Sequence, residues 1–225
     1  MEPQSRFPLI RWYRELPSTN NEAKRLSGSL DNLSVIAAEK QTAGRGRGSH
    51  SWSSAPGENL TFSVFLRFGP DGQAPLPAGE AVRITHFCTV AVCDFLISEG
   101  LQPRIKWPND IWIADRKICG ILIENSFSAG FLDTSIIGIG LNLNQKEFDP
   151  ALPNPVSAAL LTGRSYSLPD TLDALYENIC RRAEELSGTD GRARLELEFS
   201  KKMFVLDKPS QERIQASIEE FEAQR

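Results

Sequence analysis

The sequence has few of the residues that hold metals or form cross-links. Its 225 residues include 4 cysteines and 2 histidines, with no Cys-x-x-Cys pair and no Cys/His cluster. A zinc site built by the protein alone is therefore not expected, because structural zinc takes about four such ligands. The cysteines, at positions 88, 93, 119 and 180, lie among apolar residues. We expect them to be reduced core thiols in a cytoplasmic protein.

The chain also lacks the marks of a secreted, membrane or nucleic-acid-binding protein. Its first ten residues have no long apolar run after a basic stretch, so a secretory signal is not expected. No apolar run approaches the roughly 18 residues that a membrane helix needs. The net charge of −4 argues against general nucleic-acid binding. With 40% hydrophobic and 24% charged residues, the composition is that of a soluble globular domain.

Hydrophobic periodicity predicts a mixture of strands and helices. Apolar residues alternate cleanly over 60–68, which predicts a strand buried on one face only, and residues 33–38 predict another strand. Helical spacing predicts helices over 80–97 and after Ser167, and a short helix over 19–26 in which Thr19 and Glu22 are spaced as a capping box. Four further strands are expected at 104–107, 111–114, 117–123 and 135–141, with a tight turn at 115–116.

Short connections between these strands favour antiparallel pairing, and the long helices need a sheet to pack on. We therefore predict an α+β fold with a mixed β-sheet packed with helices. After residue 187 the sequence predicts a short strand at 195–199 and a charged helix at 211–224.

The segment between Lys40 and Gly57 has the least usual composition. It holds three cations, one histidine and no acid in a chain that is acidic overall. Glycines at 44, 46 and 48 let the backbone approach a ligand closely. Arg45 and Arg47 offer forked donors suited to phosphate or carboxylate. No Gly-Lys-Ser/Thr follows, so this is not a Walker A loop. A solvated, flexible loop remains the alternative interpretation.

Three further motifs are weak when each is taken alone. Lys106-Trp-Pro-Asn-Asp110 places an amide and an acid at a strand end, which is also ordinary turn chemistry. Glycines at 120, 138 and 140 indicate close approach of a ligand or a neighbouring backbone, or else bulges. Ser18-Thr-Asn20 could be only a helix N-cap.

Taken together and in order, these motifs resemble the motif series of the biotin–protein ligase family, over about residues 17–186. The series comprises Ser18-Thr-Asn20, Gln41-x-x-Gly-Arg-Gly-Arg47, Trp52, Lys106-Trp-Pro-Asn-Asp110, Arg116-Lys-x-x-Gly-Ile-Leu-x-Glu124 and Gly138-x-Gly-x-Asn142. The resemblance implies a catalytic domain over 1–187 that activates biotin with ATP and passes it to a lysine of a biotin carboxyl-carrier protein domain.

The resemblance also implies roles for individual residues. Biotin would be bound by Ser18, Thr19, Asn20, Gln41, Gly44, Arg45, Gly46, Arg47, Lys117, Gly120 and Leu122. ATP would be bound by Trp52, Lys106, Asn109, Asp110 and Asn142. Asp110 would also hold Mg²⁺, and Lys117, Arg47 and Lys106 would be the catalytic cations. This set suits the chemistry, since a carboxylate that attacks a phosphate brings two anions together and needs cations to offset their repulsion.

The sequence departs from the family pattern in three places. The third cation of the Gly-Arg loop is replaced by His50, and a histidine is mostly neutral at pH 7. No helix-turn-helix precedes Ser18, so we expect no DNA binding. Residues 188–225 are expected to be a short extension, since they are too few and too helical for the SH3-like domain that family members usually carry. Homodimer formation is left open.

Two alternative functions remain at this point. One is a lipoate or octanoate ligase or transferase of the same fold, and the other is a non-catalytic biotin-binding remnant. For the ligase, we expect the loop at 44–48 to be mobile without ligand and to become ordered when biotin or its adenylate binds, because we expect Arg45 and Arg47 to gain contacts only when a carboxylate or phosphate is present.

Overall fold

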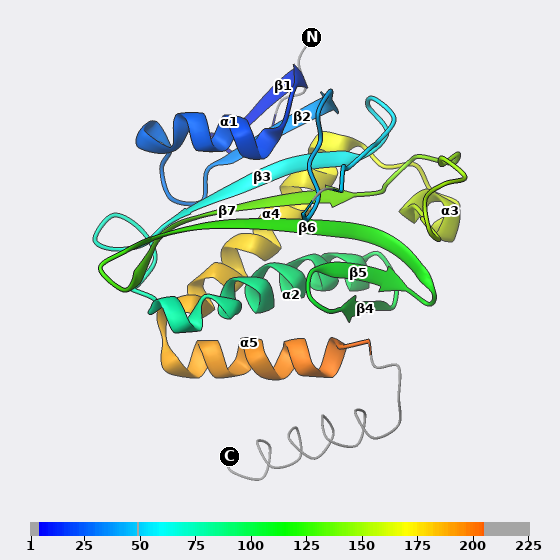
Figure 1. The fold of residues 1–225 in the computed structure, drawn as a ribbon. Helices are drawn as coiled ribbons and strands as arrows, with labels where there is room; N and C mark the ends of the chain where they lie inside the picture. Colours follow the sequence, from blue (N-terminus) through cyan, green and yellow to red (C-terminus); the bar gives the residue numbers. More distant parts are fainter. Residues whose placement is uncertain (1–4, 49, 205–225) are drawn as a thin grey trace.

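A seven-stranded mixed sheet forms the centre of the protein (Figure 1). The computed structural model describes residues 5–48 and 50–204. The strand order is β1-β2-β3-β7-β6-β5-β4, in which β1 is parallel to β2 and the other neighbouring pairs are antiparallel. The strands are β1 (Ile10–Leu16), β2 (Val35–Gln41), β3 (Leu60–Arg67), β4 (Pro103–Lys106), β5 (Asp110–Ile113), β6 (Arg116–Ser128) and β7 (Phe131–Leu141). The predicted α+β class is confirmed.

Helices cover both faces of this sheet. The long helices α2 and α4 and the helix α5 pack together beneath one face, and the short helix α1 covers part of the other (Figure 1). The helices are α1 (Thr19–Leu26), α2 (Val82–Ser98), α3 (Ala158–Thr162), α4 (Leu168–Glu184) and α5 (Thr189–Lys202), with single 3₁₀ turns at Ser27–Ser29, Ala78–Glu80 and Glu185–Ser187. The apolar face of α4 is buried as its spacing predicted.

The two-sided cover changes how β3 is buried. Its alternation predicted a strand with one exposed face, but all of its residues except Arg67 are buried. Phe62 and Val64 belong to the main core, between the sheet and helices α2 and α4. Phe65 packs with Ala23 of α1 in a second, smaller core. The prediction was wrong because it did not foresee that α1 lies over this strand.

Three local predictions were also wrong. Residues 195–199 belong to α5, because Leu195 and Phe199, four residues apart, lie on one helical face and are buried. Ser18 is the N-cap of α1 and makes no side-chain cap bond, so there is no capping box at Thr19. The β5–β6 turn is at 114–115, one residue earlier than expected, with Ala114 at a φ of 51°. The edge strand β1 was not predicted, and the helix expected at 211–224 lies outside the described residues.

One helix contradicts the expectation about membrane segments. By length and composition, the 21-residue stretch Ala78–Ser98 is apolar enough to cross a membrane. In the fold, however, 61% of its apolar 18-residue stretch is buried, and residues such as Phe87 and Val92 belong to the main core. Its apolar character is accounted for by packing against the sheet and against α4 and α5.

Candidate functional site

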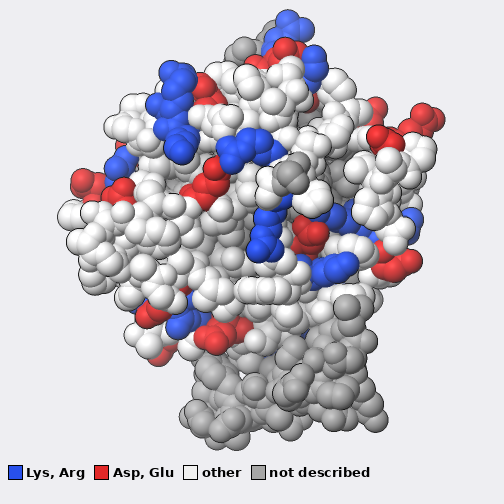
Figure 2. Space-filling view, viewed as in Figure 1, with Lys and Arg blue, Asp and Glu red and all other residues white. Residues whose placement is uncertain are grey.

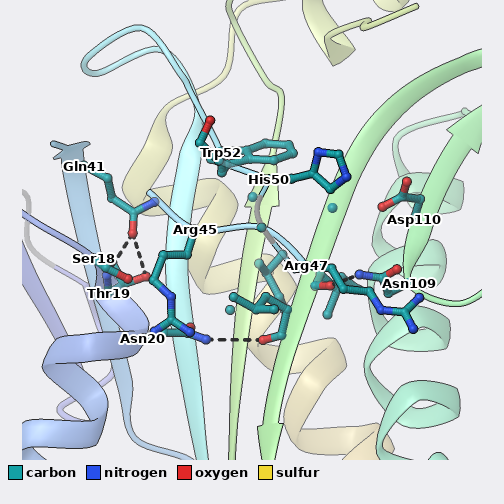
Figure 3. Close-up of a pocket in the computed structure, with 18 of the residues that line it drawn as sticks. Ser18, Thr19, Asn20, Gln41, Arg45, Arg47, His50, Trp52, Asn109 and Asp110 are labelled. Atoms are coloured by element: carbon teal, nitrogen blue, oxygen red, sulfur yellow. Dashed lines mark hydrogen bonds between the residues drawn. The ribbon is translucent and has the colours of Figure 1, made fainter. Parts of the chain in front are cut away.

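A pocket of about 180 Å³ opens over the middle of the sheet, on the face that carries α1 (Figure 3). Residues predicted for the site line it together with residues that the sequence analysis did not assign. The predicted residues are Ser18, Thr19, Asn20, Gln41, Arg45, Gly46, Arg47, Trp52, Asn109, Asp110, Lys117, Gly120 and Leu122. The others are His50, Ser51, Phe62, Ile121, Gly138, Ile139 and Gly140. Segments far apart in the sequence thus meet at one cavity.

One wall of the pocket is a polar cradle at the start of α1. The backbone N–H of Thr19 donates to Gln41 Oε1 at 2.8 Å. The Ser63 hydroxyl of β3 lies 2.8 Å from Thr19 Oγ1 and 2.6 Å from Asn20 Oδ1. Ser18, Thr19 and Asn20 are buried. Because buried polar groups are costly when unpaired, this network holds the cradle in one arrangement.

The floor of the pocket is a glycine surface on β6 and β7. Gly120 and Gly140 lie directly opposite each other in the β6–β7 ladder. A Cβ atom at Gly140 would lie 2.2 Å from the indole of Trp52, and one at Gly120 would lie 2.9 Å from it. At Gly138, a Cβ would lie 2.3 Å from Asn20 Oδ1. These glycines therefore admit the protein's own side chains. The β6–β7 ladder is regular at all three, and the irregularity of the β5–β6 ladder lies between Ile111 and Trp112, beside Gly120.

The Gly-Arg loop folds as a small hairpin over the pocket. Trp52 N–H donates to Gly44 O at 3.0 Å, and Gly46 N–H donates to His50 O at 2.8 Å. Arg45 lies 2.6 Å from Glu124 Oε1 on β6. The expectation that Arg45 lacks contacts without ligand was therefore wrong.

The other loop arginine is different. In the part of the chain that the structure describes, the guanidinium of Arg47 has no hydrogen-bond or ion-pair partner, and it points into the pocket region (Figure 3). It remains available for an anionic ligand.

One side of the pocket, where Asp110 lies on the right of Figure 3, carries an ion pair. Lys117 Nζ of β6 lies 2.8 Å from Asp110 Oδ1, and the side chains are 30% and 28% exposed. Lys117 Nζ also lies 5.8 Å from the centre of the Trp52 ring. Asn109 is turned toward β6, where its Nδ2 donates to the Ile121 carbonyl. Asp110 is the first residue of β5, so it lies at a strand end as predicted.

Three predicted residues do not line the pocket. Gly44 is buried beneath the hairpin, where a Cβ would lie 2.3 Å from Trp52 O. Lys106 lies on the edge strand β4, and its Nζ is 4.0 Å from the centre of the Trp112 ring. Asn142 is buried, and its Nδ2 donates to Val156 O at 3.1 Å.

The charges around the pocket are mixed. Lysine and arginine side chains lie beside acidic ones over the middle of this face, without a broad patch of one sign (Figure 2). Glu124, which contacts Asn20 and Arg45 of the pocket lining, is one such acid. Burial raises its pKa, but hydrogen bonds from Arg45 and Asn20 outweigh that effect and hold the pKa below its ordinary value. Among the described residues, no three His, Cys, Asp or Glu side chains are grouped to hold a metal, and Asp110 is the one carboxylate in the described pocket lining.

Comparison with known proteins identifies the family. Residues 12–142 match the model of the biotin/lipoate A/B protein ligase family. The chain belongs to that family. A biotin–[acetyl-CoA-carboxylase] ligase of Paracoccus denitrificans is 32% identical to it over 176 residues, which cover 75% of this chain and 70% of that protein.

Other relatives of this ligase family are longer. The bifunctional ligase/repressor BirA of Bacillus spizizenii is 40% identical over 136 residues, which cover 60% of this chain but only 40% of BirA. This chain therefore spans less than half the length of that relative.

Solved structures support the fold. A biotin protein ligase from Aquifex aeolicus, in complex with biotin and ATP, has a TM-score of 0.71 and 23% identity, covering 88% of this chain and 79% of that one. The enzyme from Leishmania major, in complex with biotin, has the same TM-score and identity and covers 90% and 85%.

Proposed function

We propose that this chain is a biotin–protein ligase, which uses ATP to convert biotin to biotinyl-5′-AMP and transfers the biotin to a lysine of a carboxyl-carrier protein. The observation that carries the proposal is the pocket itself. In it a buried polar cradle faces Lys117 across a glycine floor, together with Arg47, whose guanidinium has no partner among the described residues. The cradle offers both donors and acceptors, which the ureido head of biotin requires. The names of the relatives support the same activity.

In the first step, a biotin carboxylate oxygen attacks the α-phosphorus of ATP and pyrophosphate leaves. We assign the ureido head to Ser18, Thr19, Asn20 and Gln41, which line one end of the pocket. Lys117 would then offset the negative charge where carboxylate and α-phosphate meet, and Arg47 would offset charge from above. Most of the acceleration would come from holding the reactants in line and from this preorganised charge.

The residues present suit a magnesium ion that arrives with the nucleotide. Mg²⁺ in nucleotide sites is usually bound by one or two carboxylates together with phosphate oxygens and water, and Asp110 supplies one carboxylate in this pocket. When bound, the ion would neutralise phosphate charge. Asp110 would have to exchange its contact with Lys117 for this role, which would free the lysine for the reacting groups.

The remaining nucleotide residues have different proposed roles. Trp52 would form a wall between the biotin and adenine ends, since its indole covers Gly120 and Gly140 in the middle of the floor. Asn109 and Asn142 would shape the nucleotide region through their bonds to the Ile121 and Val156 carbonyls. Lys106 lies outside the pocket, so we assign it to the outer phosphates.

In the second step, the amine of the acceptor lysine attacks the biotinyl carbonyl and AMP leaves. The adenylate is reactive, so a loop that shields it from water until the acceptor arrives favours transfer over hydrolysis. The hairpin with Arg45 and Arg47 is the candidate for that shield.

Other features of the proposal concern the protein as a whole. Residues 1–187 remain the predicted catalytic domain and 188–225 the predicted extension, although α5 packs against α2. A carrier-protein partner, a cytoplasmic location, no DNA or membrane partner and an open question of homodimer formation all stay predictions. The free cysteines agree with a reducing compartment.

Pyrophosphate release tests the proposal directly. The purified chain is incubated with ATP and Mg²⁺ and with biotin, lipoate or octanoate, and a carboxyl-carrier domain is then added to measure transfer. We expect pyrophosphate release and transfer to the carrier domain with biotin, and neither with lipoate nor with octanoate. Release with lipoate or octanoate in place of biotin would favour the related ligases, and biotin binding without release would favour a non-catalytic remnant.

A further inference from the structure

The carboxylate of Glu124 joins two parts of the pocket that lie far apart in the sequence. Glu124 is on β6, two residues beyond Leu122, and is not part of the pocket lining. Its Oε1 accepts from Arg45 at 2.6 Å, and its Oε2 accepts from Asn20 Nδ2 at 2.8 Å. One side chain therefore contacts both the hairpin and the polar cradle.

The partner on the cradle side has little freedom of its own. Asn20 Oδ1 lies 2.6 Å from the Ser63 hydroxyl, and Asn20 Nδ2 lies 3.3 Å from the Leu122 carbonyl as well as 2.8 Å from Glu124. The absence of a side chain at Gly138 leaves room for the amide. With an acceptor for its NH₂ and a donor for its oxygen, the amide is held in one orientation.

The partner on the hairpin side is held at two points. Besides its contact with Glu124, Arg45 Nη1 donates to Asn21 Oδ1 at 2.5 Å. Arg45 thus connects the hairpin to α1 and to β6 at once. Among the described residues, no other ion pair joins the hairpin to the rest of the protein.

We propose that Glu124 is a positioning residue that couples the Gly-Arg hairpin to the polar cradle, so that closure of the hairpin and the orientation of Asn20 occur together. This rests on the proposed function in so far as the cradle holds biotin. The residue acts through Arg45 and Asn20 and need not touch biotin itself.

The exposure of the pair indicates a local role. The Arg45 and Glu124 side chains are 40% and 30% exposed, and ion pairs near the surface contribute little to overall stability. Loss of the pair should therefore loosen the hairpin while the sheet stays folded. An ion pair that only held the hairpin against the sheet would change hairpin access but not the affinity for biotin.

The test uses Glu124→Gln, which keeps the shape of the side chain but removes its charge, with Glu15→Gln as the matched control. Glu15 pairs with Lys40 at 2.6 Å across β1 and β2, outside the pocket lining. The first readout is the rate of tryptic cleavage between Arg45 and Gly46 in the free protein. The second is biotin affinity by calorimetry without ATP.

We expect Glu124→Gln to cleave about tenfold faster and to bind biotin about tenfold more weakly, as for loss of one charge-assisted hydrogen bond. In an Arg45→Ala background the same change should have little further effect on biotin affinity, because the coupling partner is already gone. Glu124→Asp, which keeps the charge, should have a cleavage rate and a biotin affinity between those of the wild type and of Glu124→Gln. Glu15→Gln should match the wild type in both readouts.

The outcomes separate this inference from the proposed function. If wild type binds biotin and Glu124→Gln matches it in both readouts, Glu124 does not couple hairpin and cradle. If Glu124→Gln unfolds the protein, the residue has a global role and the inference is also wrong. If wild type neither binds biotin nor releases pyrophosphate, the proposed function fails. Faster cleavage of Glu124→Gln with unchanged biotin affinity would show that Glu124 only holds the hairpin, and the coupling would be wrong.

Discussion

Lys117 Nζ lies 2.8 Å from Asp110 Oδ1, and both side chains are roughly 30% exposed. An ion pair at this exposure contributes about 0–1 kcal/mol to folding. The lysine follows the β5–β6 turn and its neighbour Ile118 is in the core, so the fold does not depend on the pair. The position of Lys117 beside the pocket is therefore better explained by a role in binding or reacting with an anionic ligand than by a role in folding.

Lys117→Ala is therefore expected to separate activity from stability. Pyrophosphate release should fall about 100-fold or more, which corresponds to about 3 kcal/mol of lost transition-state stabilisation. The free energy of unfolding should change by less than about 1 kcal/mol. Release kinetics and urea unfolding measure the two quantities. Near-normal release from a folded variant would remove Lys117 from the mechanism.

Asp110→Asn tests the magnesium assignment. The change keeps the preference for a turn but removes the negative charge, so the variant should need more Mg²⁺ for half-maximal pyrophosphate release and bind ATP more weakly. The variant also frees Lys117, so biotin affinity without ATP should not fall. Titration of Mg²⁺ at fixed ATP is the measurement. An unchanged magnesium dependence would leave Asp110 with a turn and ion-pair role only.

Gly140→Ala tests the contact between the glycine floor and Trp52. The added methyl group would lie 2.2 Å from the indole, so either the ring or the strand must move, at a cost of about 1–3 kcal/mol. We expect a lower unfolding midpoint and a shifted tryptophan fluorescence. Gly28→Ala, where nothing lies within 4 Å, is the matched control. Trp52→Ala in the same chain should recover much of the lost stability, and failure to do so would place the strain elsewhere.

The fold brings most of the residues marked by the sequence motifs to one pocket, although several elements around that pocket were predicted wrongly. Spaced motifs such as Ser18-Thr-Asn20 and Gly138-x-Gly-x-Asn142 keep their order in the chain, and the sheet brings most of them to one cavity. Sequence spacing does not show which side chain fills the space above a glycine, so the positions of Trp52 over Gly140 and of Asn20 at Gly138 could not be predicted.

Local patterns failed where tertiary contacts decide the outcome. The alternation Leu-Glu-Leu-Glu-Phe at 195–199 fits a strand, but Leu195 and Phe199 also fit one face of a helix, and packing against α2 selects the helix. Glu124 was quoted within a motif but was given no role, because its two partners come from residues 20 and 45 and meet it only in the fold.

The hairpin should exchange its amide protons more slowly when ligand is bound. Its contacts in the free protein include four points, the backbone bonds of Gly46 and Trp52 and the two bonds of Arg45, so we expect partial protection without ligand. Biotinyl-5′-AMP offers both a biotin end and a phosphate, and should add more protection than biotin alone. Hydrogen exchange over residues 41–53 measures this, and equal exchange in all three states would contradict it.

Arg47 is the cation of the hairpin that we expect to retain the adenylate. In the described residues its guanidinium has no protein partner and lies at the pocket, so its charge is free for the phosphate, whereas Arg45 is already paired with Glu124. Arg47→Gly should therefore weaken retention of biotinyl-5′-AMP more than it slows its formation. The variant should label lysines of an unrelated protein with biotin, whereas Arg47→Lys, which keeps the charge but loses the fork, should label them less.

Release of radiolabelled adenylate and labelling of a lysine-rich bystander protein are the two measurements. His50→Arg, which adds a permanent cation to the same hairpin, should slow the release of adenylate and reduce the labelling of the bystander protein. If Arg47→Gly gives no excess labelling while pyrophosphate release continues, retention depends on other residues of the pocket.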